Sequence, residues 1–277
     1  MAVYRSDEMS IRLVTDAKIE ETSPKGNQEK WYDRETDCWY KVDQFGYEAL
    51  AETVISGFLE QSNLETLLPL SFVHYRMEQL QVHGHKRAGC SSKNFLGSGQ
   101  SLITVNRLLT NFLGMPLREK LLRFSSRKKR IAFLAETTAE LTGLDKFPQY
   151  LTLLFEVDAL FCNDDRYLNN IAVIEQDGRY DYCPIFDNGA GLLSNTQVLR
   201  MDIEPSVLIA FLQASPFQTT FTRQMNTARS LYGPQLSMPR LGAENMGNPV
   251  LEYYPQRDRG IIGDRVKKCI LLRQKFC

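Results

Sequence analysis

The stretch Asn163-Asp164-Asp165-Arg166-Tyr167-Leu168-Asn169-Asn170, with the hairpin that follows it and ends in Phe186-Asp187-Asn188-Gly189, decides the expected fold of this chain. Residues 171–174 are apolar and predict a strand. Asp177-Gly178 is the strongest two-residue hairpin signal, so residues 180–187 are predicted to form the return strand. The sequence therefore predicts a polar loop that enters a β-hairpin, with a second polar group where the hairpin ends.

The predicted hairpin brings an amide and a carboxylate together. With that turn, Gln176 faces Arg179, and counting back places Asn170 and Asp187 diagonally on one face, roughly 7 Å apart at Cβ. Both side chains can then reach one Mg²⁺, which takes oxygen ligands at about 2.1 Å. Asp165 lies earlier, in the loop that enters the hairpin, where it is free to hydrogen-bond a substrate. A base, an amide ligand and a carboxylate ligand are the groups that phosphoryl transfer needs.

Spacing alone leaves a second pair open, because Asp164 and Asn169 have the same separation as Asp165 and Asn170. The predicted hairpin points Asn169 away from Asp187, which favours Asp165 and Asn170. Taken singly, these residues also fit an ordinary loop in which Asn and Asp end a helix and cap a hairpin. Their joint arrangement favours a catalytic site.

Three segments carry a resemblance to a known family. Residues 165–170 followed by Pro184-Ile185-Phe186-Asp187 resemble the catalytic and metal-binding segments of the HipA-like Ser/Thr kinases. Ser23-Pro24-Lys25-Gly26-Asn27-Gln28-Glu29-Lys30 resembles that family's phosphate loop, which has Ser, two variable residues, Gly, a variable residue and then Gln-Glu-Lys. Trp39-Tyr40-Lys41 is similar to the strand whose lysine meets the α- and β-phosphates. The segments occur in family order and span over half of the chain. The sequence departs from the family at Tyr167, where His is usual, and at Asn169, where Lys is common.

The resemblance implies ATP and Mg²⁺ as cofactors. It implies that Asp165 is the catalytic residue and that Asn170 and Asp187 hold the metal. The residues that it implies for nucleotide binding are Ser23, Lys25, Gly26, Gln28, Lys30, Lys41 and Glu52. A physical reason supports the loop, since Gly26 lets backbone N–H groups approach phosphate oxygens closely. Its composition also fits an ordinary surface turn.

Lys41 needs a carboxylate partner, because a lysine in a dry cleft is costly unless its charge is paired. Glu48 and Glu52 lie one turn apart on the helix predicted for residues 47–59, so either side chain could serve. We favour Glu52, in the middle of that helix. Glu48 lies near the helix start, where the macrodipole already stabilises an acidic residue.

The resemblance implies an α+β, two-lobed, protein-kinase-like (HipA-like) fold, and the pattern of the chain fits a strand-rich N-lobe and a mostly helical C-lobe. We place the N-lobe at residues 1–102 and the C-lobe at 103–277. Residues 101–105 predict a strand where a kinase hinge would contact adenine. Residues 127–144 predict a helix capped by Ser125 or Ser126 and ended near Gly143. Residues 149–162 predict a second, buried helix with Pro148 in its first turn. The run Arg127-Lys128-Lys129-Arg130 is best explained as a solvated first turn, although cations there oppose the helix dipole.

Composition excludes several classes of protein. Among 277 residues, 33 basic and 33 acidic side chains cancel, so no overall field attracts nucleic acid or an anionic membrane. Six cysteines without a Cys-x-x-Cys pair argue against a zinc ribbon or a disulfide framework. The N-terminus is too polar for a signal peptide, and the apolar run at 151–161 is too short to cross a bilayer. We therefore expect a cytoplasmic protein with no membrane span and no nucleic-acid partner.

These features predict an ATP- and Mg²⁺-dependent Ser/Thr protein kinase that acts on a protein substrate. The chain begins shortly before Ser23, so we expect it to lack the extra N-terminal subdomain of the longer toxin kinases, and with it much of the case for a DNA-binding antitoxin partner. The shorter branch of the family, which includes cell-translocating bacterial kinases, is the closer likeness, and delivery to host cells is compatible with it. The resemblance also implies autophosphorylation at Ser23. The alternatives are a small-molecule or lipid kinase and a nucleotide-binding interaction module without turnover.

Overall fold

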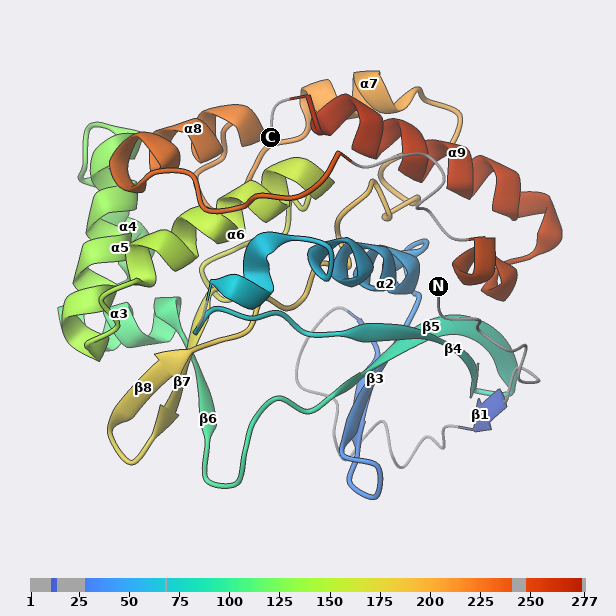
Figure 1. The fold of residues 1–277 in the computed structure, drawn as a ribbon, viewed down its shortest axis with the longest axis horizontal. Helices are drawn as coiled ribbons and strands as arrows, with labels where there is room; N and C mark the ends of the chain where they lie inside the picture. The colour runs from blue at the N-terminus through green and yellow to red at the C-terminus, as the bar shows by residue number, and fades with distance from the viewer. Residues whose placement is uncertain (1–10, 14–27, 68, 241–247, 276–277) are drawn as a thin grey trace.

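The computed structural model describes residues 11–13, 28–67, 69–240 and 248–275. Within them, the chain builds a five-stranded and a three-stranded sheet, with helices beside both (Figure 1). The strands of the first sheet follow the spatial order β1-β4-β5-β3-β2, and only the β1–β4 pair is parallel. Their bounds are β1 Ile11–Leu13, β2 Lys30–Asp33, β3 Cys38–Val42, β4 Tyr75–Val82 and β5 His85–Lys93.

The β2–β3 hairpin places the Trp31–Tyr40 pair and the Lys30–Lys41 pair on opposite faces. Trp31 and Tyr40 are cross-strand partners whose rings stack with centroids 5.7 Å apart. Lys30 and Lys41 are the next cross-strand pair, so their side chains share the other face. Residues 20–35 are mostly polar and give no strong strand signal, yet β2 forms within them, because the Trp31–Tyr40 pair gives the hairpin an aromatic contact.

Helix α2, Glu48–Leu59, packs on β4 and β5 and forms the helix predicted for residues 47–59. Its N-terminus is joined to a distant segment, since the backbone N–H of Tyr47 donates to the carbonyl of Ser194 at 3.2 Å. Gly46 lies at this crossing, where a Cβ atom would stand 1.9 Å from the Ser194 oxygen. Close backbone approach therefore requires glycine at position 46.

The second sheet has the order β6-β7-β8, with β6 Ser101–Thr104, β7 Ala172–Gln176 and β8 Arg179–Tyr182. Asp177 and Gly178 both have positive φ, at 51° and 76°, as a tight two-residue hairpin requires. Gln176 pairs with Arg179, so the predicted turn and register are confirmed. β6 is the strand of this sheet that lies toward the first sheet in Figure 1. The lobe boundary that we place after Leu102 falls inside β6 and stays a prediction.

The predicted return strand is too long. β8 ends at Tyr182, and the chain then leaves the hairpin. The Ile185 N–H donates to the Ser71 carbonyl at 2.8 Å, and the Ile185 carbonyl accepts from the Val73 N–H at 2.9 Å. Residues 183–187 thus attach to the segment before β4, so Asn170 and Asp187 are not diagonal neighbours on a hairpin face.

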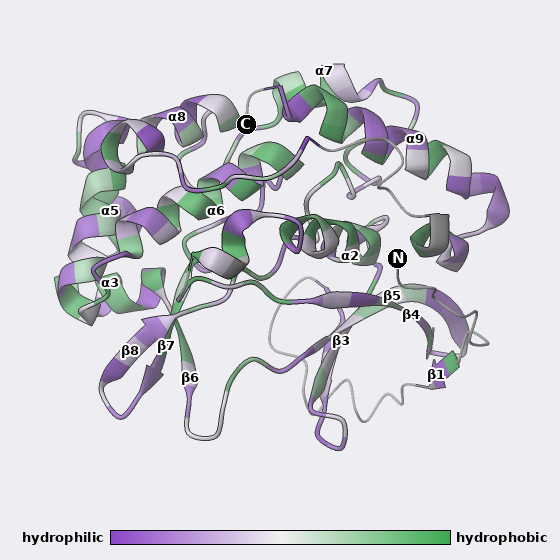
Figure 2. Cartoon of the chain, viewed as in Figure 1, coloured by the Kyte–Doolittle hydropathy of each residue, from purple (hydrophilic) through white to green (hydrophobic). Residues whose placement is uncertain are grey.

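Helices make up most of the remaining chain. Their bounds are η1 Asn63–Thr66, α3 Val105–Leu113, α4 Leu117–Leu122, α5 Arg127–Thr142, α6 Phe147–Phe161, α7 Pro205–Phe211, α8 Phe221–Tyr232, η3 Asn248–Tyr253 and α9 Gln256–Arg273. Helix α5 is capped by Ser126 and ends at Gly143, as predicted. Helix α6 is buried along almost all of its length, with Pro148 in its first turn. Figure 2 shows the hydrophobic residues of α2 and α6 in the middle of the molecule and the hydrophilic β7–β8 hairpin at its edge.

A strap formed by residues 235–237 connects α6 to the end of α2. Asn63, which follows α2, receives the Ser237 N–H on its side-chain oxygen and donates its amide to the Gln235 carbonyl, at 2.8 and 2.9 Å. On the other side, the buried carboxylate of Glu156 on α6 accepts the N–H groups of Gln235 and Leu236. The strap therefore joins the element after α2 to the central helix of the larger helical region.

The sequence predicts neither a disulfide framework nor a membrane-spanning helix. Among the residues that it describes, all five cysteines are unpaired. None of the helices in that part of the chain has the length and hydrophobicity that crossing a membrane requires.

Candidate active site

Lys41 is the centre of a buried ion cluster. Its Nζ atom lies 2.5 Å from Oε1 of Glu52 and 2.7 Å from Oδ1 of Asp187. Burial alone would lower the pKa of Lys41, but the two carboxylates outweigh it and hold the pKa well above its usual value. Lys41 therefore carries a full positive charge in a nearly dry position.

Glu52 is the helix partner of Lys41, as predicted. Its second oxygen accepts the backbone N–H of Asn188 at 2.8 Å, so one carboxylate contacts both β3 and the segment around Asp187. Glu48 does not contact Lys41 in the described hydrogen bonds and instead binds backbone N–H groups. Its oxygens accept the N–H groups of Phe45 and Gly46 at 2.6 and 3.1 Å, which stabilises the start of α2.

Asp187 is held with its carboxylate ionised and accessible. The nearby charge of Lys41 lowers the pKa of Asp187 to about 2. Its side chain keeps 31% of its surface exposed, and its backbone has a φ of 59° in the left-handed region. The Asn163 amide donates to the Asp187 carbonyl at 3.4 Å. One Asp187 oxygen contacts Lys41, and the exposure of the side chain lets the carboxylate meet a ligand.

Asp165 and Asn170 are in contact within the loop that follows α6. The Asn170 Nδ2 donates to the Asp165 carbonyl at 2.7 Å and lies 3.4 Å from Asp165 Oδ2. Because Nδ2 is engaged, the amide is oriented and its Oδ1 is left as the acceptor. Partial burial, and then the negative charge of Asp187, raise the pKa of Asp165.

The alternative pair is separated by the fold. Asn169 accepts the Asn106 amide of α3 on its Oδ1 at 2.9 Å, which directs it away from Asn170. Asp164 is half-buried, and burial followed by the charge of Asp165 raises its pKa to about 6. Of the two spacings that the sequence allows, only Asp165 with Asn170 forms a hydrogen-bonded pair among the described contacts.

Arg166 links the two polar segments of the site, and the sequence analysis missed it. The Arg166 guanidinium is fully buried and pairs with Asp158 of α6, with N–O distances of 3.1 and 3.2 Å. Its Nη1 donates to the carbonyls of Phe186 and Asn170 at 2.7 and 3.4 Å. Its Nη2 donates to Oδ1 of Asn188 at 2.6 Å. Arg166 thus joins the Asp165 loop to the Asp187 segment.

The sequence did hold a sign of this contact at Asp158. A carboxylate in a largely apolar helix needs a partner, so a buried cation could have been expected beside it.

The predicted phosphate loop is described only at its end. Ser23, Lys25 and Gly26 lie outside the described residues. The Gln28 amide donates to the Val42 carbonyl at 3.0 Å, next to Lys41 on β3. Lys30 is the cross-strand partner of Lys41, and burial and then the charge of Lys41 lower its pKa, while Asp187 opposes the effect. Two cations therefore project beside Asp187.

The donor set fits a magnesium ion bound together with a nucleotide. Mg²⁺ is commonly held by one or two protein oxygens, with phosphates and waters as its other ligands. Asn170 Oδ1 and the exposed carboxylate of Asp187 supply such oxygens. No group of three or more His, Cys, Asp or Glu side chains suited to a metal occurs in the part of the chain that the structure describes, so an all-protein cage is not formed there.

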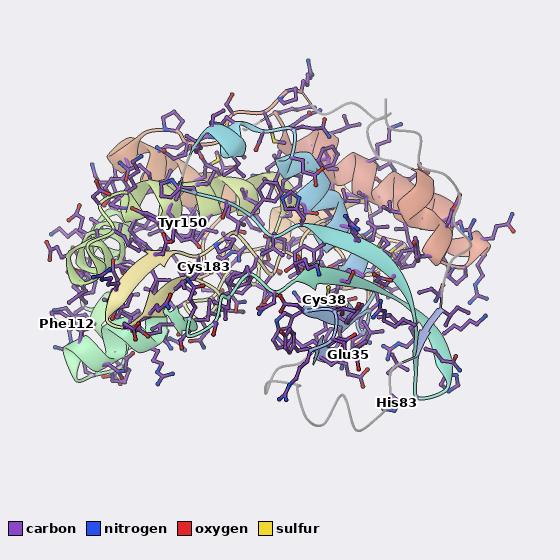
Figure 3. All side chains as sticks on the ribbon, turned by 60° about the horizontal axis from the view of Figure 1, so that its bottom comes forward. Glu35, Cys38, His83, Phe112, Tyr150 and Cys183 are labelled. Atoms are coloured by element: carbon purple, nitrogen blue, oxygen red, sulfur yellow. The ribbon has the colours of Figure 1, made fainter. Side chains whose placement is uncertain are left out.

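Two cavities lie on opposite faces of the second sheet and not at this cluster. One, of about 600 Å³, is lined by Ile174 and Gln176. The other, of about 500 Å³, is lined by Glu175 and Tyr180. Figure 3 shows Phe112, in the wall of the second cavity, at the outer edge of the molecule and far from Cys38 on β3.

Comparison with known proteins identifies the fold. No protein-family model matches the sequence, and no curated protein matches it. The crystal structure of a Helicobacter pylori proinflammatory kinase, CtkA, is similar with a TM-score of 0.59 and 14% identity, over 91% of this chain and 88% of that chain. A structure of the Shewanella oneidensis MR-1 toxin–antitoxin system HipA, HipB and its operator DNA matches with a TM-score of 0.45 and 11% identity, over 90% of this chain and 64% of that one. The chain therefore has an α+β, two-lobed fold similar to that of the kinase CtkA.

Proposed function

We propose that this protein is an ATP- and Mg²⁺-dependent Ser/Thr protein kinase. The observation that carries the proposal is the shared lysine, because Lys41 contacts Glu52 of α2 and Asp187 at once. This arrangement holds a cation and a metal-binding carboxylate where a triphosphate needs both. The kinase fold supports the same conclusion.

The nucleotide roles follow from position. Lys41 and Lys30 meet the phosphates, together with the loop of Ser23, Lys25, Gly26 and Gln28. The free edge of β6 takes the adenine, since its other edge is paired with β7. Asn170 and Asp187 would hold Mg²⁺, and the ion would supply charge neutralisation at the phosphate oxygens.

Asp165 orients the substrate hydroxyl. The hydroxyl oxygen forms the new bond to the γ-phosphorus, the bond from that phosphorus to the β–γ bridging oxygen breaks, and ADP leaves with the electron pair. The hydroxyl proton passes to Asp165. The raised pKa of Asp165 makes it a stronger base than an exposed aspartate. Positioning remains its larger contribution, because a carboxylate is still a weak base at neutral pH.

Ser23 is the proposed site of autophosphorylation. A phosphoserine would add about −1.5 to −2 charge where the ATP phosphates bind, so repulsion would lower ATP affinity and switch the enzyme off. The Ser23→Ala variant should stay active and lose one phosphosite. An unchanged phosphosite map in that variant would reject this regulatory role and leave the kinase assignment standing.

The test of the function is incubation of the purified protein with labelled ATP and Mg²⁺, followed by phosphosite mapping by mass spectrometry. The expected result is phosphoserine or phosphothreonine on protein, absent from the Asp165→Asn variant. Transfer to a lipid or small alcohol without protein phosphorylation would favour a small-molecule kinase. ATP binding with no transfer to any acceptor would favour an interaction module.

A further inference from the structure

A half-open cavity beside the catalytic loop is not used by the proposed chemistry. It measures about 500 Å³ and lies between β6, α3 and the β7–β8 hairpin. Its apolar wall includes Leu108 and Phe112 of α3, Leu141 of α5 and Tyr180 of β8. Phe112 is 58% exposed at the border of this cavity, so its ring is available to a ligand, and Arg107 and Glu175 add charged groups to the wall. We call this cavity the α3 groove.

The α3 groove is attached to the catalytic loop. The first residue of α3, Val105, donates its N–H to the Ile171 carbonyl at 2.8 Å. Asn106 donates its N–H to the Leu168 carbonyl at 3.2 Å and its side-chain amide to Asn169 at 2.9 Å. A molecule bound in the groove is therefore held at a fixed position relative to Asp165, which lies in the same loop.

The surface around α3 is strongly basic, although the formal net charge of the whole chain is zero. Residues 105–130, which form α3, α4 and the start of α5, contain eight Lys or Arg and one Glu. None of these eight cations forms an ion pair in the part of the chain that the structure describes. The run Arg127–Arg130 begins α5, where cations oppose the helix dipole. Two of these cations have structural contacts, since Arg130 donates to the Phe124 carbonyl and Lys120 lies over the Phe124 and Phe133 rings. The excess of positive charge in this segment would nevertheless attract an acidic ligand.

We propose that the α3 groove and this basic surface form a docking site for an acidic segment of a protein substrate that carries a bulky apolar side chain. The apolar side chain fills the groove against Phe112 and Leu108, and the acidic residues face Arg107 and the cations of α4. Leu108, Phe112 and Leu141 in the groove wall suit an apolar side chain better than a phosphate backbone, which disfavours nucleic acid. The proposal rests on the proposed function and adds a substrate class to it.

Binding can be measured without catalysis. The probe is a short fluorescein-labelled peptide with a Leu-Phe pair between two runs of glutamate, and its binding to the whole protein is followed by fluorescence anisotropy. Two matched peptides replace glutamate by glutamine or the Leu-Phe pair by Ser-Ser. The wild-type protein should bind the first peptide most tightly, and its affinity should fall as salt is added.

Variants locate the binding site. Phe112→Ser and the double variant Arg107→Glu/Arg118→Glu should each weaken binding about tenfold, the loss expected for a central anchor or a close charge pair. The controls are Phe211→Ser, which changes an 80% exposed phenylalanine on α7, and Lys86→Glu, which changes an exposed lysine on β5. Neither control should alter the affinity. All four should keep wild-type autophosphorylation, because none touches the Lys41 cluster.

Three outcomes would overturn the proposal. Phe112→Ser and Phe211→Ser could bind the peptide equally well, or the glutamine peptide could bind as tightly as the glutamate peptide. A single-stranded oligonucleotide of equal charge could bind more tightly than the peptide and lose that binding in Arg107→Glu/Arg118→Glu, which would make the site one for nucleic acid. Absence of autophosphorylation in the wild type would contradict the proposed function, while the anisotropy result would still decide the docking site.

Discussion

Lys41 and Asp187 are 146 positions apart in the sequence, yet Nζ of the lysine lies 2.7 Å from Oδ1 of the aspartate. Glu52 completes the cluster and uses its second oxygen on the Asn188 N–H. The lysine and the carboxylate that we propose for binding phosphate and metal are therefore already paired in the protein alone.

The first prediction concerns the partners of Lys41. Lys41→Ala should reduce phosphate transfer by orders of magnitude. It should also destabilise the fold, because removing one partner of a buried ion pair leaves the other charge unpaired, which costs about 3–5 kcal/mol of stability. Glu52→Gln should cost less, since one amide oxygen can accept from Lys41 or from Asn188 but not from both. Glu48→Gln should cost least, because Glu48 contacts only backbone at the start of α2. Steady-state kinetics on the three variants checks this order, and equal losses for the two glutamates would contradict it.

The second prediction assigns the base. Asp165→Asn should abolish transfer and leave ATP affinity within a few-fold, because it spares Lys41 and the proposed metal ligands. Asp164→Asn is the matched control and should keep most activity, since Asn170 hydrogen-bonds Asp165. Nucleotide binding by calorimetry and transfer of labelled phosphate measure the two effects. Full activity in Asp165→Asn would move the role to Asp164.

The third prediction makes Arg166 a positioning residue. Arg166→Lys loses the paired contact with Asp158 and cannot reach Phe186, Asn170 and Asn188 together. The Mg²⁺ concentration needed for half-maximal activity should therefore rise.

The control for Arg166 is Arg229→Lys, which weakens a different ion pair on α6, with Glu156. It should lower the melting temperature without changing the Mg²⁺ requirement. A merely structural role for Arg166 would make the two variants indistinguishable in the Mg²⁺ titration.

The fourth prediction tests the crossing at the start of α2. Gly46→Ala should prevent stable folding or displace α2, because its Cβ would stand 1.9 Å from a backbone oxygen. Gly57→Ala, within the same helix, has open space around the added Cβ and should stabilise the protein by about 0.5–1 kcal/mol. Urea unfolding of both variants gives the comparison. Similar stabilities would show that the Ser194 segment moves away at little cost.

The fifth prediction concerns Asp43, a buried carboxyl that accepts the Ala49 N–H at 2.6 Å and the Tyr254 hydroxyl at 2.7 Å. Burial raises the pKa of Asp43 to about 8. The folded state then holds a proton that the unfolded chain releases near its ordinary pKa of 3.8, so this stabilisation is complete at low pH and is lost as pH rises toward 8.

The asparagine in Asp43→Asn cannot titrate. As pH rises from 5 to 8, the unfolding free energy of the wild type should therefore fall relative to that of the variant, by up to about 4 kcal/mol. Glu48 and Arg87 are the other charged groups whose electrostatic effect reaches Asp43, and both are retained in the variant. Urea unfolding at the two pH values measures the shift. A constant difference would show that Asp43 is ionised in the folded protein throughout.

Local signals in the sequence predicted local structure well. The Asp177-Gly178 turn, the Ser126 cap with Gly143 at the end of α5, and the buried helix α6 depend on residues close together in the chain, and all three form as expected. The Lys41–Glu52 pair was also predictable, because only two carboxylates were available on the following helix.

Contacts chosen by the tertiary fold were not predictable in this way. The sequence of residues 183–187 does not indicate that the backbone of Ile185 hydrogen-bonds to Ser71 and Val73 and does not continue the hairpin. The hydrogen bonds of Arg166 likewise depend on Asp158, Phe186 and Asn188, which the tertiary fold brings together from separate parts of the sequence. The spacing of two residues in the sequence does not reveal which distant segment will hydrogen-bond to the chain between them.

The strap of residues 235–237 has a consequence for how such an enzyme is controlled. Helix α2 is attached at its start to Ser194 and, through Asn63, at its end to Ser237, so both of its ends are tied to later parts of the chain. Helix α2 therefore holds Glu52 against Lys41 without help from a modified loop or a second protein. In an enzyme built in this way, control by phosphorylation of Ser23 would act on nucleotide binding and would leave the Lys41–Glu52 pair intact.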